Sequence, residues 1–221
     1  VLIACAAAGI IIGVVTKTGV GLRLASGLID LAGGMLLPAM FFTMITAIVL
    51  GMGVPTTANY VITSTIAAPA LEQMGVPVLA AHMFVFYFGI IADVTPPVAL
   101  AAYAGAGISG GNALKTGVHA SKLAIAAFII PYVFVLSPVL LMVDATPLAL
   151  VSVTISALLG MIAVSSALCG FLADHCRPYE RLLLIAAGLL MIAPGSTTDL
   201  VGLALFVVIL VMQYRRAKEA A

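Results

Sequence analysis

Long apolar segments alternate with short polar turns along the whole chain. Residues 1–15 are apolar and rich in Gly and Ala, which predicts the end of a transmembrane helix. Segment 20–31 is mildly amphipathic, so we expect a helix that lies along the membrane surface. Segments 115–142 and 147–172 are each long enough to cross a bilayer, since a transmembrane helix needs about 20 residues.

Two apolar segments in the first half of the chain are interrupted in the middle. The first covers 36–72 and is broken at 51–57 by the sequence Gly-Met-Gly-Val-Pro-Thr-Thr. Each arm has roughly fifteen residues, or about 22 Å of helix, whereas the hydrocarbon core is about 30 Å thick. We therefore favour a re-entrant helical hairpin with its tip near mid-membrane over one long kinked helix.

The second interrupted segment covers 78–108 and is broken at 93–97 by Asp-Val-Thr-Pro-Pro. Two adjacent prolines remove two N–H donors and disfavour a helical residue before them, which predicts a discontinuous helix. In lipid, an interrupted helix persists only where it is buried in protein or lines a polar cavity. A pair of such segments indicates the substrate and ion site of a transporter.

The last apolar segment, 182–214, contains a polar break at 194–199 and allows two interpretations. Basic residues flank it on both sides: Arg177, Arg181, Arg215, Arg216 and Lys218. Since Lys and Arg prefer the cytoplasmic side, the segment dips into the membrane and returns if both ends are cytoplasmic. Otherwise it crosses once. We favour the dip.

Composition supports a membrane protein and excludes other classes. Hydrophobic residues make up 64% of the chain, charged residues 8%, and the mean hydropathy is +1.30; a soluble domain has roughly 25% charged residues. We expect an all-α, multi-pass integral membrane protein. A net charge of +1 gives no reason to expect a nucleic-acid partner, and three scattered cysteines support neither zinc nor a disulfide. Because it begins with Val1, we expect a piece of a longer protein.

The first interruption presents two helix ends to one place. Free carbonyls at a helix C-terminus carry about half a negative charge, and free N–H groups at an N-terminus about half a positive charge. The carbonyls of Gly51 and Gly53 are therefore candidate Na⁺ ligands. The N–H groups after Pro55 are candidate contacts for a substrate carboxylate, with hydroxyls from Thr56 and Thr57.

The second interruption divides in the same way. Asp93 and Thr95 are candidate cation ligands, and Pro97 opens the second half-helix on the substrate side. A charge at mid-membrane costs about 2.5–3.5 kcal/mol, so Asp93 is a functional candidate, although it can instead cap the broken helix. Asn59 lies within reach of the hairpin tip and is equally suited to substrate contact or to hydrogen bonding within the hairpin. For His82 we favour a hydrogen-bonded interhelical histidine over a proton relay.

Four stretches together resemble one family in sequence and spacing: Gly-Met-Gly-Val-Pro-Thr-Thr-Ala-Asn-Tyr at 51–60, Ala-Ala-Pro-Ala-Leu at 67–71, Ala-Ala-His-Met-Phe-Val-Phe-Tyr-Phe-Gly at 80–89, and Thr-Pro-Pro-Val-Ala-Leu-Ala-Ala-Tyr at 95–103. The chain is similar to the large membrane subunit of tripartite ATP-independent periplasmic (TRAP) transporters, and most of all to the fused permeases of the TAXI type. The likeness covers residues 1–142.

The resemblance implies an elevator-type secondary transporter that imports small organic acids, with Na⁺ or in some cases H⁺ as the coupling ion and no cofactor. A periplasmic binding protein delivers the substrate, and the permease lies in a bacterial or archaeal inner membrane. Residues 1–143 would form the second inverted repeat, with hairpin 36–72, broken helix 78–108 and span 115–142. Residues 144–221 would add C-terminal membrane segments, and N-terminal transport and scaffold regions would complete the permease. Asp93 departs from the family pattern, which has a small residue there.

Two other classes fit less well. An ion channel also uses carbonyls at broken helices, but it should repeat one filter segment, whereas the two breaks here are unlike each other. A structural scaffold role stays open for 145–221. An intramembrane enzyme lacks support, because the chain has no His-Glu-x-x-His motif, and Gly107–Gly110 has no nearby histidine to partner its serine.

Overall fold

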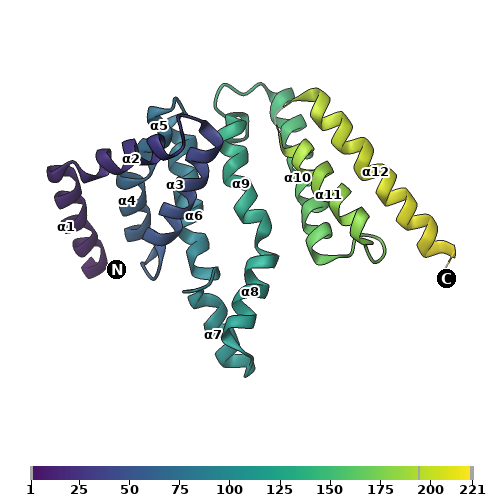
Figure 1. Cartoon of the computed structure of the whole chain (residues 1–221), viewed down its shortest axis with the longest axis horizontal. Coiled ribbons are helices and arrows are strands. Elements are labelled where there is room, and N and C mark those ends of the chain that lie inside the picture. The colour runs from purple at the N-terminus through teal and green to yellow at the C-terminus, as the bar shows by residue number, and fades with distance from the viewer. Residues whose placement is uncertain (1, 194, 220–221) are drawn as a thin grey trace. The chain divides into compact units, whose positions relative to one another are not determined.

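The computed structural model describes residues 2–193 and 195–219, which form α-helices, two short 3-10 helices and the turns between them (Figure 1). Val1, in the first predicted helix, and Pro194, in the last predicted break, lie outside the described residues. Within the described part, three helices are long and apolar enough to cross a membrane: Ala113–Leu136, Pro147–Cys169 and Thr197–Arg216. The predicted all-α membrane architecture is confirmed.

The chain divides into two compact units, Val1–Val135 and Leu136–Ala221. The sequence-based division was drawn after residue 143. In the first unit, α1 (Leu2–Thr18) and α2 (Val20–Leu31) are bent by 69° relative to each other. Gly19 joins them with a φ of 68°, a conformation that glycine adopts without a steric penalty.

The hairpin consists of α3 (Leu36–Gly51), α4 (Thr56–Ile66) and α5 (Ala68–Gln73), and the chain reverses between α3 and α4 (Figure 1). The second arm is itself interrupted at Ala67. Pro69 accounts for this interruption, because a proline removes a helical N–H and is tolerated only in the first turn of a helix.

The broken helix packs against both arms of the hairpin. Its first half is α6 (Val78–Ile91), followed by the 3-10 turn η1 (Ala92–Val94) and the second half, α7 (Leu100–Ser109). Apart from His82 the α6 segment is almost wholly apolar, and Phe84 and Phe88 are fully buried. A helix of this kind is typical of a buried position between other helices.

The next segment consists of α8 (Ala113–Leu123) and α9 (Ile125–Leu136). The predicted span to residue 142 is therefore too long, since the α-helix ends at Leu136. Pro138 explains the difference: it disfavours a helical Ser137, and the residues from Pro138 on form a 3-10 turn.

The second unit is a three-helix assembly of α10 (Pro147–Cys169), α11 (Pro178–Ile192) and α12 (Ser196–Glu219), in which α11 packs against both neighbours. Glycines allow this close approach. A Cβ added at Gly188 would lie 2.6 Å from the carbonyl oxygen of Gly160, so only a residue without a side chain fits.

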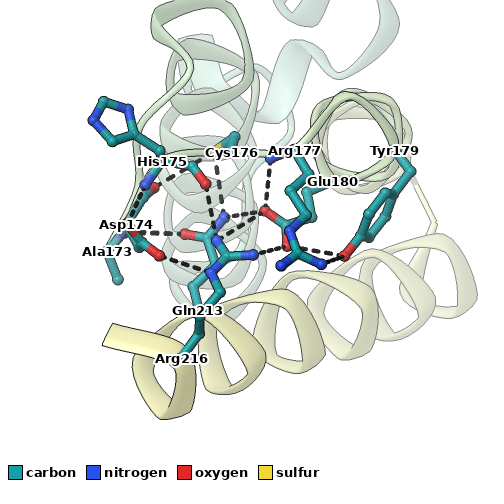
Figure 2. Close-up of polar contacts among 9 residues, drawn as sticks. All are labelled: Ala173, Asp174, His175, Cys176, Arg177, Tyr179, Glu180, Gln213 and Arg216. Carbon is teal, nitrogen blue, oxygen red and sulfur yellow. Dashed lines mark hydrogen bonds and ion pairs between the residues drawn. The ribbon is translucent and has the colours of Figure 1, made fainter. Parts of the chain in front are cut away.

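Both basic ends of the last apolar segment lie on the same side of the second unit. Arg216, near the end of α12, is 2.9 Å from Glu180, in the first turn of α11 (Figure 2). The single-crossing interpretation is therefore wrong. The returning arm is also longer than a shallow dip requires, because α12 has 24 residues and contains a segment long enough to span a membrane.

Candidate functional site

The hairpin tip is a tight turn between two helix ends. α3 ends at the buried Gly51, Gly53 adopts a φ of 71°, and Pro55 is the extended residue before α4. The N–H of Val54 reaches the Gly51 carbonyl at 3.4 Å, a long hydrogen bond. The negative end of the α3 dipole and the positive end of the α4 dipole therefore meet at the tip.

Three carbonyls at the break of the helix accept hydrogen bonds from side chains. Thr95 donates its hydroxyl to the Ile91 carbonyl at 2.7 Å, and the Ser121 hydroxyl of α8 lies 3.2 Å from the Val94 carbonyl. The Tyr103 hydroxyl donates to the carbonyl of Pro97 at 2.9 Å. These side-chain donors bind carbonyls near the interruption of the helix, so these polar groups have hydrogen-bond partners.

The two interruptions share a cavity of about 380 Å³. Six residues line it: Gly53, Val54, Pro55, Asp93, Leu100 and Ala101. Among these lining residues Asp93 carries the single formal charge, and it lies in η1, opposite the hairpin tip. The tertiary fold thus brings backbone from the tip, one carboxylate and the start of α7 around a common space.

Of the nine residues that the sequence singles out, three line this cavity: Gly53, Pro55 and Asp93. Four others lie near the breaks but outside the lining: Thr56, Thr57, Thr95 and Pro97. Thr56 and Thr57 are exposed, whereas the Thr95 hydroxyl is already bonded to a backbone carbonyl. The remaining two, Gly51 and Asn59, are buried and do not line the cavity.

Asn59 is wedged between two glycines of neighbouring helices. A Cβ added at Gly51 would lie 2.9 Å from the Asn59 amide nitrogen, and one at Gly89 would lie 2.6 Å from the amide oxygen. The side chain is 2% exposed, and its Oδ1 has no hydrogen-bond partner among the described residues. Gly89 was not singled out from the sequence; the signal was an isolated glycine within an apolar helical run, which often has a packing reason.

His82 joins three parts of the first unit at the base of the hairpin. Its Nδ1 is 2.9 Å from the Tyr60 hydroxyl, and its Nε2 is 3.0 Å from a Glu72 carboxylate oxygen. The prediction of a hydrogen-bonded interhelical histidine is confirmed, because Tyr60 belongs to α4, Glu72 to α5 and His82 to α6.

Residues 1–149 match the protein-family model described as "Tripartite ATP-independent periplasmic transporter, DctM component". The match covers the hairpin, the broken helix and the cavity between them. No curated protein and no solved structure matches the chain.

Proposed function

Because the chain belongs to the DctM family of TRAP transporter membrane components, we propose that it imports small organic acids by coupling their movement to Na⁺. A periplasmic binding protein supplies the substrate, and the bacterial or archaeal inner membrane holds the permease. The family consists of transporter components and not of enzymes. The fused TAXI type is the form that we propose for the whole protein.

The observation that carries this proposal is the cavity shared by the two interrupted segments. We assign the Gly53 carbonyl and the Asp93 carboxylate, whose residues both line the cavity, as oxygen ligands from its two sides. The Gly51 carbonyl, which accepts the Val54 N–H, adds the negative end of the α3 dipole. A cation here offsets the cost of a carboxylate in an apolar segment. Thr95 supports the arrangement from behind by holding the end of α6.

The start of α4 supplies the opposite charge. Its first N–H groups lie just after Pro55, and no side chain caps them. We assign these groups, with the exposed hydroxyls of Thr56 and Thr57, to the substrate carboxylate. Asn59 and Pro97 complete the proposed substrate side, Asn59 by fixing the tip from behind and Pro97 by opening the approach to α7.

Na⁺-dependent uptake by the complete permease, reconstituted with its binding protein, tests the cation assignment. We expect Asp93→Asn to weaken the Na⁺ dependence by at least about tenfold, which corresponds to roughly 1.4 kcal/mol of lost cation binding. Thr56→Val should raise the KM for substrate instead.

Asp30→Asn is the matched control, because Asp30 is an exposed acid on α2 that does not line the cavity. It should transport like the wild type. An Asp93→Asn protein with unchanged Na⁺ dependence would show that the carboxylate does not serve the coupling ion.

A further inference from the structure

The charges of the second unit are strongly polarised. Its Lys and Arg residues all lie at one end, either at the start of α11 or at the end of α12: Arg177, Arg181, Arg215, Arg216 and Lys218. At the opposite end, the segment before α10 contributes Asp144 and the first turn of α12 contributes Asp199. Since Lys and Arg concentrate on the cytoplasmic side of membrane proteins, this polarity marks the basic end as cytoplasmic.

One arginine at this end forms ion pairs with two acidic side chains. The Arg216 guanidinium lies 2.7 Å from Asp174 and 2.9 Å from Glu180 (Figure 2). Gln213 completes the cluster by donating to Glu180 at 2.9 Å. Glu180 is 1% exposed, so its charge is satisfied inside the unit.

The other basic residues are left to face outward. Arg177, Arg181, Arg215 and Lys218 form no ion pair with any side chain that the structure describes. All four are exposed. The basic end therefore presents positive charge that internal acids do not neutralise.

The two faces of α12 divide these roles. The inward face carries Phe206, Ile209, Gln213 and Arg216, of which Gln213 is fully buried. The outward face forms a shallow groove of about 460 Å³, in which apolar side chains lead to two cations: Leu210, Val211, Tyr214, Arg215 and Lys218. The apolar side chains, the aromatic ring and the two cations follow one another along the groove. They match in order the acyl chain, the interfacial region and the headgroup of a lipid.

We propose that this groove binds an anionic phospholipid of the cytoplasmic leaflet. The lipid phosphate lies against Arg215 and Lys218, and an acyl chain follows Leu210 and Val211. Tyr214 occupies the level of the glycerol group, where amphipathic rings concentrate. Charge complementarity selects the headgroup, and the apolar track distinguishes a lipid from a free phosphate ion.

Lipid retention by the complete permease, measured by native mass spectrometry after release from detergent, tests this assignment. The wild type should retain phosphatidylglycerol in preference to phosphatidylcholine. Each cation near a lipid surface contributes about fivefold to binding, so Arg215→Gln with Lys218→Gln should lower phosphatidylglycerol affinity roughly 30-fold. Arg215→Lys with Lys218→Arg keeps both charges and should retain the lipid.

The matched control removes two charges elsewhere, as Lys115→Gln with Lys122→Gln, both exposed on α8. It should retain phosphatidylglycerol at this groove like the wild type. Equal retention of the two lipids by the wild type, retention by the Arg215/Lys218 double variant, or equal loss in the control would each overturn the proposal. Displacement of the lipid by millimolar inorganic phosphate would overturn it too, because it would indicate a simple anion site.

Discussion

At the scale of single residues, the position of the hairpin tip depends on two glycines. Gly51 and Gly89 let the backbones of α3 and α6 pack directly on each other, with the amide of Asn59 against both glycines. This contact fixes the level of the tip relative to the break that begins one residue after α6. The cavity residues at the tip are therefore positioned by glycines that do not themselves line the cavity.

Gly89→Ala should damage both stability and transport. The new Cβ would meet the Asn59 amide oxygen at 2.6 Å, and overpacking of this kind costs about 1–3 kcal/mol. A lower thermal midpoint of the purified permease and weaker Na⁺-dependent uptake check the expectation. Gly105→Ala is the control, since a Cβ there meets nothing within 4 Å; comparable loss in both variants would show that the Asn59 contact is unimportant.

At the scale of elements, the interrupted helices are stabilised by neighbours that supply the missing hydrogen bonds. Ser121 of α8 reaches the break, and Gly117 of the same helix packs against Pro96 and Tyr103. A Cβ at Gly117 would lie 3.2 Å from atoms of both. The break is consequently a packed structure that presents Asp93 to the cavity, and the hairpin tip, with the exposed Gly53 and Pro55, lines the same space.

The hairpin tip should show ligand-dependent access. We expect a cysteine introduced as Val54→Cys, at a cavity-lining position, to react with a membrane-impermeant maleimide more slowly when Na⁺ and substrate are present. Labelling rates from each side of proteoliposomes, in a protein whose native cysteines are replaced, provide the measurement. Ser26→Cys, exposed on α2, should react independently of ligand. Fast labelling of Val54→Cys from both sides with or without ligand would favour a channel.

At the scale of the whole molecule, the two units use charge differently. The first unit exposes the Asp93 carboxylate to a cavity, while the second binds two of its carboxylates, Asp174 and Glu180, through Arg216. The family match reaches residue 149, so α11, α12 and most of α10 lie beyond it. In the second unit the ion cluster joins the loop after α10 to both following helices.

This cluster should make the second unit sensitive to acid. The Arg216 guanidinium and the His175 N–H hold the pKa of Asp174 below its usual range. Because the pKa is lowered on folding, the stabilisation is complete above the unfolded value of about 3.9 and is lost as the pH falls through the folded value. Thermal midpoints recorded from about pH 3 to 7 should therefore fall less steeply with acid for Asp174→Asn than for the wild type.

The control for this series is Asp30→Asn, an exposed acid on α2 that makes no ion pair with the described side chains. Its midpoint should follow the wild-type curve. If Asp174→Asn also keeps the wild-type slope, the Arg216 pair does not contribute to the pH dependence.

The sequence by itself determined the helices, their approximate ends and the two interruptions, because apolar periodicity, Gly and Pro act through local backbone preferences. It also predicted that His82 is hydrogen-bonded between helices, and it identified the family. Only the tertiary structure decided which polar groups face the shared cavity. Asp93 lines it and Thr95 does not, because the Thr95 hydroxyl bonds to the Ile91 carbonyl one turn earlier, while the tip residues that share the cavity with Asp93 come from a segment about forty residues away in the chain.

Tertiary contacts also give Arg216 and Arg215, at the end of α12, different roles. Neighbouring arginines are equivalent in a local pattern, but successive residues of a helix point about 100° apart. Contacts with segments distant in sequence then choose the face, so that Asp174 and Glu180 bind Arg216 while Arg215 turns outward. Local sequence determines where the helices form, whereas tertiary contacts determine which side chains of each helix face a site.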